Sequence, residues 1–241
     1  GLSDEDIEQR AIERYDELSD LLASSPDLQH QLAATLFKIS AGQPTALDDL
    51  LRLQKTLPDD PIVHWRLLDA CDVRRRHPYC ASGDYEAAAI RVLGDNLEAW
   101  GKIAYYRSQR GDDSNALQAL ENAAAATTVD DLWGTETHLL FQSMSAVENV
   151  NAAERLLEAI GYTAAFAQPH LDLVSHCISQ AQTSVNWARA CRNFAARKER
   201  GSRTIMGRAI GAGLLNSLYL QSGMTQQAQD GKIDPLTSLL E

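Results

Sequence analysis

The chain has 241 residues, a hydrophobic fraction of 44% and a formal net charge of −11, from 33 acidic and 22 basic side chains. The apolar content argues against a disordered chain, and the acidic balance argues against general binding to nucleic-acid phosphates. Only 6% of the residues are aromatic, Ala and Leu dominate, and the Val–Ile–Thr alternation of strands is nearly absent. Because Ala and Leu favour helices, we expect an all-α fold without a β-sheet.

The first part of the chain predicts helices separated by turn residues. Ser3 can cap the first helix, and Pro26 ends it. The segments at 40–44 ("SAGQP") and 58–61 ("PDDP") break the chain again. Five apolar residues form one stripe along the first helix: Ile7, Ala11, Tyr15, Leu18 and Leu22. The next helices are expected over 27–40, 45–56 and 62–75.

The remaining helices are expected over 84–93, 96–110, 113–126, 130–147, 151–160, 163–181, 184–199 and 203–221, with a short piece after Pro235. Their short connections predict antiparallel hairpins stacked into an α-solenoid, an α–α superhelix. No stretch is long and apolar enough for a membrane span, because Arg208 and Asn216 interrupt the nearest one, at 205–220. Gly207 and Gly211 in that stretch predict a close contact between two helices.

Residues 97–128 carry a recognisable pattern, "LEAWGKIAYYRSQRGDDSNALQALENAAAATT". Gly111 falls at the turn between its two helices, Arg107 stands where Tyr is usual, and Thr128 stands where Pro is common. The positions that match are Trp100, Ile103 and Ala104 in the first helix and Ala116, Leu120 and Ala123 in the second. In this pattern the segment resembles a tetratricopeptide repeat.

A looser copy of the repeat begins at Trp65 and Leu68 and resumes at Gly83 and Ala87, with a cysteine-bearing insertion at its turn. The resemblance implies a TPR-like fold and an association with protein binding, without naming a partner. We therefore expect N-terminal helices over 1–60, TPR-like repeats over 61–161 and helical hairpins over 162–241. Together they are expected to form one continuous elongated domain.

The four cysteines lack the spacing of a metal or redox site. Neither C-x2-4-C nor C-x-x-C occurs, and His170, His176 and Cys177 offer no second ligand pair nearby. Four buried free thiols are a further alternative. Because the metal and redox spacings are missing, we expect no metal and no cofactor.

Hairpin geometry instead favours two disulfides, Cys71–Cys80 and Cys177–Cys191. Thr183 or Ser184 can start a new helix midway between the second pair, and Pro78 interrupts a helix between the first. Cysteines equally far from a hairpin turn face each other, at a Cα distance that overlaps the range of a disulfide. Such bridges predict an oxidising compartment, the periplasm or the exterior, with the cytoplasm as the alternative. The chain also begins with Gly rather than Met, as expected of a trimmed or mature protein.

No catalytic motif is present: the sequence contains no G-x-S-x-G elbow, P-loop, dinucleotide fingerprint or H-E-x-x-H. Glu136, near His138 in "WGTETHLL", is the best candidate acid of a glycan-cleaving site. We nevertheless expect it to be a solvent-exposed acid in the first turn of a helix, where the helix dipole favours negative charge. We name no catalytic residue.

The candidate residues for a binding surface are cations and tryptophans. Trp65 and Trp100 are expected in the core, because they occupy repeat-core positions. The segment 189–208 holds seven basic residues against Glu199 alone, which is typical of a solvated helix face and alternatively of an anion-binding patch. The residues expected to contact a partner are Arg74, Arg75, Arg76, Trp133, Trp187 and Arg192.

The sequence therefore predicts a non-enzymatic helical-repeat module of the envelope or exterior of a bacterial-type cell. We expect it to bind a protein or peptide rather than nucleic acid. The alternative is an envelope enzyme acting on glycan or peptide, or the helical accessory domain of one.

Overall fold

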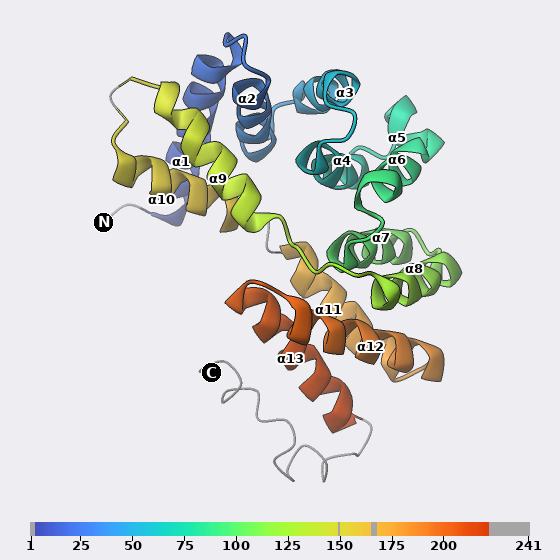
Figure 1. Cartoon of the computed structure of the whole chain (residues 1–241). Coiled ribbons are helices and arrows are strands. Elements are labelled where there is room, and N and C mark those ends of the chain that lie inside the picture. The colour runs from blue at the N-terminus through green and yellow to red at the C-terminus, as the bar shows by residue number, and fades with distance from the viewer. Residues whose placement is uncertain (1–2, 149, 165–167, 222–241) are drawn as a thin grey trace. The chain divides into compact units, whose positions relative to one another are not determined.

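The computed structural model describes residues 3–148, 150–164 and 168–221 (Figure 1). Over these residues it contains thirteen α-helices, one 3-10 turn and no strand, which confirms the all-α class. The helix ends lie close to those predicted, and the main addition is a helix of five residues, α5 (Pro78–Ser82). The short helix expected after Pro235 lies outside the described residues.

The helices form two compact units, and each unit is built from two separate stretches of the chain. The first unit contains residues 1–92 and 132–167, and the second contains residues 93–131 and 168–241. This grouping differs from the three consecutive regions expected from the sequence, because residues 93–131 pack with the C-terminal helices. A solenoid that runs through the whole chain stays a prediction.

The first unit has a core of aromatic and aliphatic side chains. Tyr15, Phe37 and Tyr162 pack together, with ring centroids 5.5 to 6.4 Å apart. Ser3 caps the first helix as predicted, through a reciprocal hydrogen-bond pair with Asp6. The helices of this unit are α1 (Asp4–Ala23), α2 (Leu28–Ser40), α3 (Ala46–Thr56), α4 (Pro61–Val73), α5, α6 (Asp84–Leu93), α9 (Trp133–Ser143), the 3-10 turn η1 (Met144–Ala146) and α10 (Ala152–Ala164).

A buried ion pair joins the two stretches of the first unit. Arg66 of α4 donates from Nε to Oε1 of Glu136 on α9 over 2.7 Å, and its Nη2 donates to the other carboxylate oxygen. Both side chains are almost fully buried, at 1% and 0% exposure. The guanidinium also pairs with Asp69 over 3.1 Å and lies over the ring of Tyr162. Burial raises the pKa of the Tyr162 phenol well above 10, so that the ring stays neutral beside the cation.

The second unit is organised around α12 (Val185–Gly201), which packs against the four other helices. Gly101 of α7 permits a close approach: a Cβ there would lie 2.8 Å from the ring of Phe194. Lys198 of α12 donates to Glu98 of α7, and both are buried, so this unit also contains an ion pair between its two stretches. The other helices are α7 (Leu97–Gln109), α8 (Asp113–Ala125), α11 (Gln168–Ala181) and α13 (Ile205–Gln221).

The contact predicted from Gly207 and Gly211 is the packing of α13 on α12. A Cβ on Gly211 would lie 2.5 Å from the backbone nitrogen of Glu199 and 2.9 Å from the carbonyl oxygen of Ala195. Only glycine therefore allows the two backbones to come this close. Among the described helices, none combines the length and hydrophobicity that crossing a bilayer requires.

The start of α7 is tied to the segment that follows α8. Asn96 caps α7 by accepting from the backbone nitrogen of Glu98, and its amide donates to the carbonyl of Asp130 over 2.7 Å. The backbone of Leu97 donates to the carbonyl of Thr128 over 2.9 Å. Thr128, which departs from the repeat pattern, thus has a structural role here, because a proline at this position would lack the backbone N–H that Thr128 donates to Asp95.

Candidate docking loop

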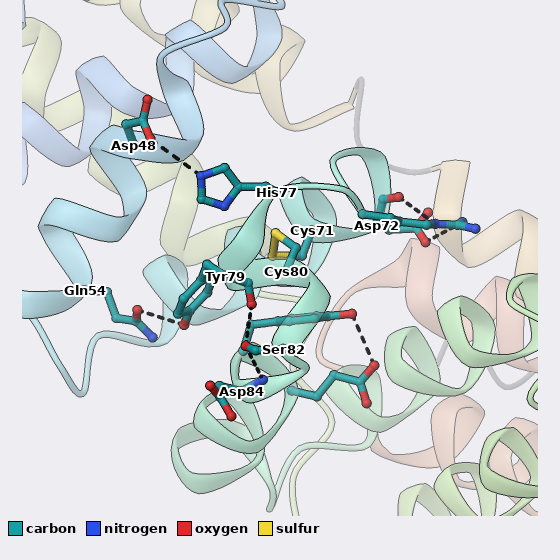
Figure 2. Close-up of a disulfide and its surroundings, with 12 residues drawn as sticks. Asp48, Gln54, Cys71, Asp72, His77, Tyr79, Cys80, Ser82 and Asp84 are labelled. Atoms are coloured by element: carbon teal, nitrogen blue, oxygen red, sulfur yellow. Dashed lines mark hydrogen bonds and ion pairs between the residues drawn. A yellow bond between two sulfur atoms is a disulfide. The ribbon is translucent and has the colours of Figure 1, made fainter.

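A disulfide closes the loop between α4 and α5. Cys71, near the end of α4, is bonded to Cys80 of α5, with their Cα atoms 5.0 Å apart and nine residues of sequence separation (Figure 2). Pro78 starts α5, and His77 before it has the extended backbone that a residue preceding proline prefers. The pairing is the one predicted from the sequence. We call residues 72–77 the docking loop.

Hydrogen bonds to residues in and before α3 also hold the docking loop in place. Arg74 donates to the backbone carbonyl oxygens of Gln43 and Pro44, between α2 and α3. Tyr79 donates to Gln54 of α3 over 2.9 Å, and Figure 2 shows both side chains directed toward each other. Burial raises the pKa of the Tyr79 phenol, which keeps it a neutral donor. These contacts fix the backbone on which the loop side chains stand.

The three arginines of the loop have different environments. Arg74 is half-buried, and its hydrogen bonds to the two carbonyls make it a support rather than a contact residue. Arg75 is 46% exposed and pairs with Asp72 over 2.7 Å. Arg76 is exposed, and within the described part of the chain it forms no ion pair. The sequence predicted all three as contacts, so the structure separates a supporting arginine from two presented ones.

An apolar side chain stands beside these cations. Val73, the last residue of α4, is 83% exposed. Residues 72–77 line an open hollow of about 560 Å³. His77 lies at the edge of the loop, with its Nε2 3.9 Å from a carboxylate oxygen of Asp48. No sequence pattern indicates that Val73 is exposed, because its exposure depends on where α4 ends.

The second disulfide joins α11 to α12 in the second unit, with the Cα atoms of Cys177 and Cys191 5.7 Å apart. This pair too is the one predicted, and Ser184 caps α12 midway between the cysteines. Because Cys177 is bonded, its thiol is not available as a metal ligand beside His176. The side chain of His170, the third member of that group, is outside what the structure describes.

The other expected partner contacts are buried or half-buried. Trp187 is only 5% exposed and packs edge-on against His176, so it belongs to the core and not to a binding surface. Trp133, at the start of α9, and Arg192, on α12, are half-buried. Of the two tryptophans assigned to the core, Trp65 is buried, whereas Trp100 is half-buried and donates to the carbonyl of Gly94.

The expectation that Glu136 is exposed is wrong. The carboxylate is fully buried, and Arg66 satisfies it through two hydrogen bonds. The local sequence could not indicate this, because Arg66 lies 70 residues earlier in the chain. A carboxylate engaged in this way is not available as a catalytic acid, since it is buried and bound to a cation.

Comparison of the chain with protein-family models, with curated proteins and with solved structures found no match.

Proposed function

We propose that the chain is a non-enzymatic helical-repeat protein of the tetratricopeptide-like kind that binds a protein partner through the docking loop. We place it in an oxidising compartment, the periplasm or the cell exterior. The compartment is supported by the two disulfides, which account for all four cysteines. The binding role rests on one observation: a disulfide-closed, externally braced loop presents Val73, Arg75 and Arg76 to solvent.

The chemistry of the loop indicates what the partner offers. A guanidinium is planar and binds carboxylates through two parallel hydrogen bonds, and Arg is enriched at the energetic centres of interfaces. The exposed Val73 beside these arginines favours an apolar side chain on the partner. The partner segment is therefore an acidic residue next to an apolar one. Because the loop is fixed in advance, little conformational entropy is lost on binding.

A photo-crosslinking amino acid at position 76 tests this function. In the native envelope fraction we expect a discrete crosslinked partner from position 76 and none from Gln9, an exposed control position on α1. A peptide from the crosslinked segment should then bind the purified chain, and Arg75→Glu with Arg76→Glu should weaken it at least tenfold. Equal crosslinking at both positions, or a peptide affinity that the charge reversal leaves unchanged, would overturn the proposal.

A further inference from the structure

The turn between α12 and α13 presents a second surface, in the other unit and far from the docking loop in sequence. Two apolar residues at the start of α13 face solvent: Ile205 is 77% exposed and Met206 is 49% exposed. Neither contributes to the core that α13 forms with α12. Keeping these two apolar side chains in water is unfavourable, so burying them against a partner would lower the free energy.

Three arginines flank this apolar pair in the sequence, and we call the five residues the turn patch. Arg200 is the second-last residue of α12, Arg203 lies in the turn, and Arg208 lies in the first turn of α13; all three are exposed. Arg200 donates from Nε to the backbone carbonyl of Ala196 over 3.1 Å, and Arg208 donates from Nε to that of Ser202 over 2.9 Å. Within the described residues none of the three forms an ion pair.

The acids next to the turn do not neutralise the turn patch. Asp131 is half-buried and accepts a hydrogen bond from Thr204 over 3.0 Å. Glu199, half-buried on α12, is the single acidic residue among the seven cations of 189–208. The turn is therefore a cationic surface on a chain whose formal net charge is −11. A local patch of this sign on an acidic protein directs it toward an anionic surface.

We infer that the turn patch docks the protein on an anionic lipid bilayer. Exposed Ile and Met side chains can enter the boundary between headgroups and acyl chains, while the long stems of the arginines keep the guanidinium groups at the phosphates. Charge complementarity selects anionic lipids, and each arginine near such a surface contributes about fivefold in partitioning, from about 1 kcal/mol. The inference does not depend on the function proposed for the docking loop.

Flotation of the full chain with vesicles of phosphatidylcholine alone and with added phosphatidylglycerol tests the inference. We expect binding to the anionic vesicles only, and about a twenty-five-fold loss in Arg203→Ala with Arg208→Ala, from two fivefold factors. Arg75→Ala with Arg76→Ala removes the same charge at the docking loop and should leave vesicle binding unchanged. Equal binding to both vesicle types, or no loss in the turn variant, would overturn the inference.

A second measurement separates the lipid from an acidic protein. Met206→Trp places a fluorophore on the turn patch, and we expect its emission to shift to shorter wavelength with anionic vesicles. Ile205→Ser with Met206→Ser should lower vesicle binding, because the apolar insertion is lost. If that variant binds vesicles as the parent does, or if poly-glutamate in solution competes and gives the same emission shift, the surface recognises acidic chains and the lipid inference is refuted.

Discussion

Replacing Glu136 with Gln removes the negative charge that the buried guanidinium of Arg66 binds. The two side chains are 0% and 1% exposed, so water cannot replace the carboxylate. Asp69 remains as a second partner, 3.1 Å from Arg66 and 14% exposed. Breaking one side of a buried ion pair typically costs 3–5 kcal/mol. Because one acid remains, we expect a loss at the lower end of this range, about 3 kcal/mol in the free energy of unfolding.

Urea unfolding followed by far-UV circular dichroism measures this loss. With a denaturant slope of about 2 kcal/mol per molar urea, the midpoint should fall by about 1.5 M. Replacing both partners, Arg66→Met with Glu136→Leu, should recover most of the stability, because two apolar residues of similar size need no counter-charge. Asp59→Asn is the matched control: its exposed pair with Arg91 contributes at most about 1 kcal/mol.

A free energy of unfolding for Glu136→Gln within about 1 kcal/mol of the parent chain would refute a role for the unpaired Arg66 charge. A double replacement as unstable as the single one would refute that role as well, because the cost would then come from packing and not from an unpaired charge.

Three further outcomes follow from the second unit. Cys177→Ser with Cys191→Ser should lower the free energy of unfolding by about 3 kcal/mol, from the entropy of closing a loop of this length. Alkylation of the unreduced parent protein should find no free thiol. Four free thiols would contradict the bridges. Gly211→Ala should cost about 1–3 kcal/mol in thermal unfolding, because its Cβ meets the backbone of α12. The control Gly213→Ala, with open space around its Cβ, should be neutral or slightly stabilising. Equal effects of the two substitutions would rule out the close approach at Gly211. Burial lowers the pKa of His176 below 6.5. The unfolded state therefore holds the proton more tightly, so the stability present above pH 6.5 is lost as the pH falls through the folded-state pKa. His176→Gln should reduce that loss in unfolding measured against pH, and an unchanged profile would exclude this histidine as the cause.

Local sequence signals were sufficient for the helices and the cysteine pairs. Proline and capping residues mark where helices begin, so the predicted ends lie close to those in the structure. Both disulfides follow from the same local logic, since each links neighbouring helices. The helix α5 was missed because five residues between Pro78 and Gly83 carry too little periodic pattern to detect.

Features that depend on distant residues could not be predicted. Glu136 carries no local sign that Arg66 will bury it. Arg74 resembles Arg75 and Arg76 in the sequence, yet its partners lie about thirty residues earlier, at the end of the α2–α3 connection. Trp187 occupies an unremarkable helix position, and only the packing of α11 on α12 shows that it is buried. The sequence therefore named Arg75 and Arg76 among the candidate contacts, but it could not separate them from Arg74 or show that Trp187 is buried.

The interleaving of the two units sets an order of events during synthesis. Residues 1–92 leave the ribosome before α9 exists, so Arg66 has no Glu136 to bind until 70 more residues have been added. At about 5–20 residues per second this delay lasts roughly 4–14 s. Residues 93–131 are made during the delay but wait in turn for α12, which brings Lys198 to Glu98. The first unit can thus be completed while the second is still half made.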